Sequence, residues 1–239
     1  MIERHLAKLR ARDDISAEEE EAIRWAVADY REYPSRKTII PAEQELTFST
    51  LLLSGMLARF KDLRSGGRQI TELHVAGDFA DLHSFTLKRL DHAVETLGPC
   101  KVALVPHDRL REITVRYPHL TRVYWFTTNL DAAIHREWVF SLGQRRAQQR
   151  MAQLFCEMHI KLSLVGLVEN GSYDLPLTQE ELGQVLGLTS VHVNRTLQLL
   201  REQGTVEFRS GRVTIFDVEQ LRHSAEFDPS YLYLEKRPR

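Results

Sequence analysis

Residues 176–204 restrict the fold of this chain more than any other segment, because they describe two short helices joined by a tight turn. Thr178 and Glu181 have the spacing of a capping box, which satisfies free N–H groups at a helix start. Gly187 suits the left-handed backbone that ends such a helix, and Thr189 can cap the next one. Apolar residues recur at helical spacing at Leu182, Val185, Leu186, Val193, Leu197 and Leu200. The pattern predicts a helix-turn-helix.

A hairpin pattern follows this segment directly. Residues 205–209 and 212–216 alternate in polarity around Ser210-Gly211, which predicts two strands joined by a glycine turn. A helix-turn-helix with such a hairpin is a winged helix, and the outer face of its second helix carries short or hydrogen-bonding side chains suited to base edges in the major groove. The predicted DNA-binding residues are Thr178, Gln179, Thr189, Ser190, Val191, His192, Asn194, Arg195, Gln198, Arg209 and Arg212. A winged helix that contacts only a protein partner is the alternative.

The first half of the chain has a different pattern. Residues 13–30 predict a helix that opens with a capping box at Ser16 and Glu19. Short apolar or alternating runs then predict strands in an antiparallel sandwich or barrel, at 38–40, 50–54, 69–75 and 101–105. Residues 55–60 and 68–75 are predicted to pair as a hairpin.

Helical patterns return after residue 107. A short helix is predicted over 108–116, and Pro118 can open a longer one. Its apolar residues recur every three or four positions, at Leu120, Val123, Tyr124, Thr127, Leu130, Ala133, Ile134 and Trp138. This seam resembles a coiled coil and predicts a dimer interface, with Leu120, Val123, Tyr124, Thr127, Leu130, Ile134 and Trp138 as its contacts. The alternative is one amphipathic helix lying on its own domain. Residues 144–165 predict a further amphipathic helix, and residues 166–174 a loop.

Composition narrows the classes of function. With 32 Lys and Arg against 33 Asp and Glu, bulk positive charge cannot hold nucleic acid, although a local basic face can. Two cysteines exclude a disulfide framework and a four-thiolate cluster within the chain. The charged start and the lack of an 18-residue apolar run predict a cytoplasmic protein without a membrane partner. No glycine-rich phosphate loop, zinc-spaced ligand set or nucleophile elbow is present, so no enzymatic activity is expected.

Taken in order, these segments resemble the Crp/Fnr family of bacterial transcription regulators. The resemblance rests on Leu53-Ser54-Gly55, Gly67-Arg68-Gln69-Ile70, Gly77-Asp78-Phe79 and the winged helix, and it covers residues 15–222. It implies an α+β chain with a cyclic-nucleotide-binding-like β-roll (1–117), a dimerisation helix (118–143), a winged helix-turn-helix (144–222) and a tail (223–239). It further implies a homodimer on a near-palindromic operator in double-stranded DNA, with RNA polymerase as a partner.

The family's effector pocket corresponds here to Gly77, Asp78, Phe79, Asp81, Arg89, Leu90 and Asp91. Members that bind cyclic nucleotides have a Glu for the ribose and an Arg-Ser or Arg-Thr pair for the phosphate. The Glu is absent here, with Asp81 nearby, and Leu90-Asp91 stands at the Arg-Ser place, where Asp91 would repel a phosphate. We therefore expect weak or no cyclic nucleotide binding. Gating by an unidentified small effector stays open.

Other family cofactors are not expected either. No cysteine precedes Cys100, which excludes the N-terminal iron-sulfur cluster of oxygen-sensing relatives. The scattered His74, His83 and His92 with Cys100 do not argue for haem, which remains only an alternative effector, and Cys156 is expected to be a buried structural thiol.

The recognition helix and the tail depart from the family pattern. Arg195 matches an arginine that pairs with guanine, whereas Val191 replaces a Glu that accepts from cytosine and suits a thymine methyl group instead. The apolar run 231–234 is expected to pack on the body or on a second subunit, and the basic residues at 236, 237 and 239 are candidates for DNA contact.

Overall fold

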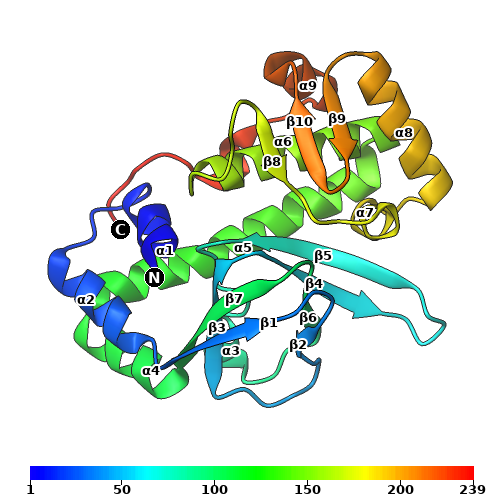
Figure 1. Cartoon of the computed structure of the whole chain (residues 1–239). Coiled ribbons are helices and arrows are strands. Elements are labelled where there is room, and N and C mark those ends of the chain that lie inside the picture. Colours follow the sequence, from blue (N-terminus) through cyan, green and yellow to red (C-terminus); the bar gives the residue numbers. More distant parts are fainter.

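The computed structural model describes all 239 residues. One long helix, α5 (Pro118–Gln144), runs through the middle of the molecule (Figure 1). A β-roll lies along one side of α5, and a smaller C-terminal domain packs near the far end of the helix. The amino and carboxyl ends of the chain lie close together beside α1 (Glu3–Arg10). The structure is an α+β fold, as predicted.

The β-roll consists of two antiparallel sheets. The first has the order β1 (Asp29–Tyr33), β7 (Cys100–Pro106), β3 (Phe48–Ser54). The second has the order β2 (Thr38–Ile40), β6 (Ala93–Thr96), β4 (Met56–Asp62), β5 (Arg68–Val75). The predicted hairpin is β4–β5, with Met56 opposite Val75 and Asp62 opposite Arg68. A single helical turn, α3 (Ser84–Leu87), follows β5, and α4 (His107–Arg116) leads from β7 to α5.

The N-terminal prediction was right at its start and wrong at its end. Ser16 and Glu19 form the capping box of α2 (Ala17–Ala26). The helix stops at Ala26 and does not continue to Tyr30, which lies in β1 opposite Ala103 of β7. Backbone pairing with β7 therefore outweighs the helical spacing of the side chains. Helix α1 was not predicted.

The C-terminal domain contains the predicted helices and hairpin with one extra strand. Helix α6 (Ala147–Ser163) is followed by β8 (Ser172–Asp174), α7 (Gln179–Leu186), α8 (Ser190–Glu202), β9 (Val206–Arg209) and β10 (Arg212–Ile215). Strand β8 pairs with β10 and makes a three-stranded sheet, so the segment 166–174 is not entirely loop. Helix α9 (Val218–Ala225) crosses the predicted domain boundary at residue 222.

The apolar seam of α5 faces its own chain, which corrects the predicted dimer interface. Leu120, Val123 and Tyr124 are buried with the N-terminal helices and β3. Ile134 and Trp138 are buried among β4, β5 and the C-terminal domain, and Leu130 packs against the same cluster. Thr127 is half-buried. The alternative interpretation, an amphipathic helix on its own domain, therefore describes five of the seven residues, because burial within the chain keeps them from a second copy: Leu120, Val123, Tyr124, Ile134 and Trp138.

The β-roll and the C-terminal domain share one continuous core of 32 buried residues. Met56 and Leu73 of the β-roll belong to the same cluster as Phe155 and Leu182 of the C-terminal domain. At the surface of this contact, Gln69 of β5 donates to the carbonyl of Gln184 in α7 at 2.6 Å. The helix-turn-helix is thus held directly against the β-roll.

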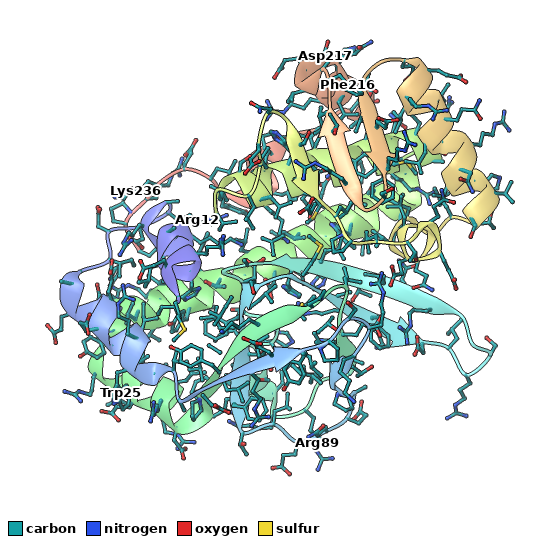
Figure 2. All side chains as sticks on the ribbon, viewed as in Figure 1. Arg12, Trp25, Arg89, Phe216, Asp217 and Lys236 are labelled. Carbon is teal, nitrogen blue, oxygen red and sulfur yellow. The ribbon has the colours of Figure 1, made fainter.

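The tail packs back on the body of the same chain. A 3-10 turn, η1 (Pro229–Leu232), contacts α5, and Tyr231 donates its hydroxyl to Glu157 of α6 at 2.8 Å. Lys236 pairs with Asp14 beside α1 (Figure 2), so the basic end lies away from α8. No helix in this structure is both long and apolar enough to span a bilayer.

Candidate nucleic-acid interface

The turn between α7 and α8 has the geometry that the sequence predicted. Thr178 and Glu181 complete the capping box of α7, and Thr189 caps α8 by accepting from the His192 N–H at 3.4 Å. Gly187 ends α7 with φ 63°, in the left-handed region. A Cβ at Gly183 would lie 2.5 Å from the Leu188 carbonyl oxygen. Only glycine allows this close approach, so the two helices cross at a fixed distance.

The hairpin after α8 forms a narrow wing. Ser210 and Gly211 both have positive φ, 51° and 74°, which is the backbone of the turn that suits a two-residue hairpin. Arg209 and Arg212 lie opposite each other at the tip. Arg212 pairs with Asp174 of β8 at 2.8 Å, which offsets part of its charge. Arg209 has no such partner and is the freer cation for a phosphate.

All eleven residues predicted to bind DNA are exposed. They come from the start of α7, from α8 and from the wing, and α8 forms the outer edge of the molecule (Figure 1). The Arg195 guanidinium makes no hydrogen bond or ion pair within the chain, so all of its donors face solvent. Asn194 donates to the Ser190 carbonyl at 3.1 Å and Gln198 to Glu202 at 2.8 Å, contacts that an incoming base edge would replace.

A groove along α8 adds one residue that the sequence analysis missed. The groove lies between the start of α7, α8 and β9, and is lined by Gln179, Asn194, Leu197, Gln198, Arg201, Glu207, Phe208 and Arg209. Arg201 is exposed and follows Asn194 by seven positions, so both share one side of α8. That spacing was readable in the sequence.

The seven residues of the implied effector pocket do not surround a common cavity. Asp81 and Leu90 are buried in the interior, whereas Arg89 and Asp91 are exposed. Arg89 lies at the outer edge of the β-roll (Figure 2), and Asp91 pairs with Lys61 at 2.7 Å. Gly77, Asp78 and Phe79 instead border a small cavity beneath α1. The implied pocket stays a prediction, and the burial of its seven residues does not place them on one common surface.

The interior of the β-roll already contains a cation with its own partners. Arg59 of β4 is 2% exposed and donates to the Ala80 carbonyl at 2.8 Å and to Asp131 of α5 at 3.0 Å. It also forms an ion pair with Glu72 of β5. Burial raises the pKa of the adjacent Asp81 to about 7. The guanidinium charge is thus neutralised by carboxylates of this chain.

The histidine and cysteine residues considered for cofactors do not come together as one set of ligands. His74 is buried near Glu72, and the rings of His83 and His92 are 5.4 Å apart. No three His, Cys, Asp or Glu side chains in the structure are grouped to hold a metal ion. Cys156 is buried as predicted, and burial raises the pKa of its thiol to about 12, so it stays protonated at neutral pH.

Comparison with known proteins agrees with this geometry. Residues 149–224 match the family described as the Crp-like helix-turn-helix domain. The chain is 29% identical over 217 residues to the transcriptional activator protein FnrL of Cereibacter sphaeroides, covering 88% of this chain and 86% of that protein. It is 25% identical over 173 residues to the transcriptional activator protein FnrA of Stutzerimonas stutzeri, covering 72% and 70%.

The fold has a solved counterpart. The structure of FixK2 from Bradyrhizobium japonicum superposes with a TM-score of 0.76 at 24% sequence identity. The match covers 82% of this chain and 96% of FixK2.

Proposed function

Because the chain is a DNA-binding transcription regulator of the Crp/Fnr family, we propose that it acts as a homodimer on a near-palindromic operator. The observation that carries the site assignment is the outward face of α8, where Arg195 is exposed with no partner in the chain. A guanidinium in this position forms two parallel hydrogen bonds to O6 and N7 of guanine in the major groove. Two copies then read two half-sites about one helical turn apart.

The neighbours of Arg195 define the rest of the half-site. Val191 is 76% exposed and offers a methyl contact to thymine, with no acceptor for a cytosine amine. Asn194 exchanges its bond to the Ser190 carbonyl for an adenine edge. Arg201 and Arg209 border the groove beside α8 and are assigned to phosphates. The resulting half-site keeps a guanine and replaces the family's cytosine-paired position.

The dimer contact is assigned to the exposed stripe of α5. Exposed or half-buried residues alternate at spacings of four and three, at Pro118, Arg122, Trp125, Asn129, Ala132, Arg136, Val139 and Gly143. The spacing is that of the seven-residue repeat of a two-helix seam, with the apolar series Trp125, Ala132 and Val139 beside a polar series at positions 122, 129 and 136. Trp125 and Val139 are 67% and 71% exposed, large apolar side chains that gain by burial against a second copy.

We assign no cyclic nucleotide to the β-roll. The argument is that Arg59 is already neutralised by Glu72 and Asp131, so a phosphate would have to displace a buried carboxylate. Constitutive binding, with control through the amount of protein, fits this interior. We propose a cytoplasmic, non-catalytic role with RNA polymerase as a further partner.

Selection of bound sequences from random duplex DNA, with no effector added, tests the proposal. We expect a two-fold symmetric site to be enriched and its binding to weaken steeply as salt rises. A winged helix that serves only protein contact would enrich no sequence and show no such salt dependence. Enrichment only after addition of a small molecule would contradict constitutive binding while leaving the DNA assignment intact.

A further inference from the structure

A second site lies far from the helix-turn-helix, in a cavity of about 40 Å³ beneath α1. It is bordered by one face of α1, the turn after β5, the first half of α5 and the last residue of the tail. Its polar lining residues are His5, Lys8, Arg12, Asp13, Asp78, Thr127 and Arg239. Of the two carboxylates, Asp13 pairs with Arg239 at 3.6 Å and Asp78 pairs with Lys8. The volume is several times the about 10–15 Å³ that one water needs. Most of these residues lie outside the segment on which the family resemblance rests.

His5 lines this cavity and has a hydrogen-bond acceptor without a partner. The side chain is 3% exposed, and its Nδ1 lies 2.9 Å from the Gly77 carbonyl. A carbonyl can only accept, so Nδ1 carries the proton and Nε2 holds a lone pair. Burial lowers the pKa of His5 to about 4, which keeps the ring neutral. Nε2 is buried and has no hydrogen-bond partner in the chain.

Arg12 has a positively charged side chain with an N–H group that lacks a hydrogen-bond partner. Its Nε is buried without a partner, and its other nitrogens make only long contacts to the carbonyls of Lys8 and Leu232, at 3.5 and 3.3 Å. No carboxylate lies within ion-pair distance of Arg12, whereas Lys8 pairs with Asp78. A largely buried guanidinium without a counter-ion is costly, and a bound anion removes that cost.

We propose that this cavity binds a small hydroxylated oxyanion of the 2-hydroxycarboxylate type. One anionic oxygen accepts from the Arg12 Nε–H, and the hydroxyl of the same molecule donates to His5 Nε2. Bicarbonate and dihydrogen phosphate carry the same pairing of anionic oxygen and hydroxyl, so they are the other sources of this chemistry. A plain carboxylate satisfies Arg12 and leaves His5 Nε2 without a donor.

The site lies against α5, so a bound ligand can connect α1 and the tail to this helix. The lining residues Val123, Phe126 and Leu130 belong to α5, and Arg239 stacks on the Phe126 ring at 3.5 Å. A bound anion would therefore tie α1 and the tail to the helix that carries the proposed dimer face. The inference does not depend on DNA binding, because no residue of the winged helix takes part.

The test is an NMR titration of the full-length, ¹⁵N-labelled protein with sodium glycolate, following the His5 Nε2 resonance. We expect a saturable shift, and acetate, which lacks only the hydroxyl, should bind at least about tenfold more weakly. Titrations with bicarbonate and with inorganic phosphate separate the possible sources. Two results would overturn the proposal. The first is the absence of a shift with glycolate, bicarbonate or phosphate up to about 10 mM, which would mean that the cavity holds only water. The second is equal binding of acetate and glycolate.

Two variants localise the effect. Arg12→Gln removes the donor and should weaken glycolate binding at least about tenfold. Arg10→Gln is the matched control, since Arg10 is the last residue of α1, two positions before Arg12, but is exposed and paired with Glu20. Unchanged binding in Arg12→Gln contradicts the assignment. If Arg12→Gln does not fold, the comparison of glycolate with acetate on the unmodified chain decides alone.

Discussion

Arg36, in the turn between β1 and β2, lies with its Nη1 2.7 Å from Oε1 of Glu181 in α7. The same Glu181 carboxylate accepts from the Thr178 N–H at 2.7 Å, so one side chain both caps α7 and holds it to the β-roll. With the Gln69 contact to the Gln184 carbonyl, this fixes how the helix-turn-helix sits against the β-roll.

Glu181 should therefore matter more to stability than Arg36. We expect Glu181→Ala to lower the free energy of unfolding by about 1 kcal/mol, because a cap is lost. Arg36→Ala should cost less, since Arg36 is partly exposed and such ion pairs contribute about 0–1 kcal/mol. Urea denaturation of both single variants and the double variant measures the coupling. A cost for Arg36→Ala equal to that for Glu181→Ala would show that the ion pair, not the cap, dominates.

Arg195→Ala should weaken operator binding by about 1–3 kcal/mol and relax specificity at one base pair. The reason is the loss of a bidentate contact to guanine. Fluorescence anisotropy with the selected operator and its single-base variants measures both effects. Arg89→Ala, on the far edge of the β-roll (Figure 2), is the control and should bind normally. A uniform loss over all sequences would make Arg195 a phosphate contact instead.

The buried carboxyl of Asp81 should give a pH-dependent stability. Its pKa is raised from 3.8 to about 7, so between these values the folded state keeps a proton that the unfolded state has lost. The free energy of unfolding of the wild type therefore falls as pH rises through this range. In Asp81→Asn this contribution is absent, because the amide does not titrate. We expect the stability of Asp81→Asn relative to wild type to increase by at least about 1 kcal/mol from pH 5 to pH 8.

Asp91→Asn is the control for this measurement, which uses urea denaturation at both pH values. Lys61 holds the pKa of Asp91 below its ordinary value, so Asp91 titrates below the range. The relative stability of Asp91→Asn should stay constant between pH 5 and pH 8. A constant value for Asp81→Asn as well would mean that the Asp81 carboxyl is ionised in the folded protein.

Two substitutions in α5 should separate association from folding. Trp125→Glu places a charge in the proposed seam and should weaken the dimer at least about tenfold with little loss of monomer stability. Ile134→Ala empties a buried position and should cost about 2–5 kcal/mol of folding free energy. Sedimentation equilibrium and thermal unfolding measure the two effects. If Ile134→Ala dissociated the dimer and Trp125→Glu did not, the dimer interface would instead be the apolar seam that includes Ile134.

The local parts of this fold could be predicted because their signals are local. The capping boxes at Ser16 and Thr178, the glycine turn at Gly187 and the β4–β5 hairpin each depend on residues a few positions apart. The exposed α8 side chains followed from the same patterns. The predictions that were wrong concerned contacts between residues far apart in the sequence. Apolar periodicity located the inner face of α5, but it could not tell burial in the same chain from burial in a second copy.

The cavity beneath α1 could not be predicted from the sequence for the same reason. Nothing near His5 or Arg12 in the chain indicates that both residues line one cavity, because α5 and the tail complete it from far away in the sequence. Likewise, the neutralisation of Arg59 depends on Asp131, 72 positions further along. The implied effector pocket was aligned by motif spacing, and motif spacing does not report that Arg89 points outward.

The continuous core has a consequence for how the molecule comes apart. Since 32 buried residues from the β-roll, α5 and the winged helix form one cluster, melting either part strips apolar cover from the other. Heat should therefore unfold the chain in a single cooperative transition, with the calorimetric enthalpy equal to the van't Hoff enthalpy. The β-roll and the winged helix, which are separate segments of the sequence, should therefore unfold as one unit.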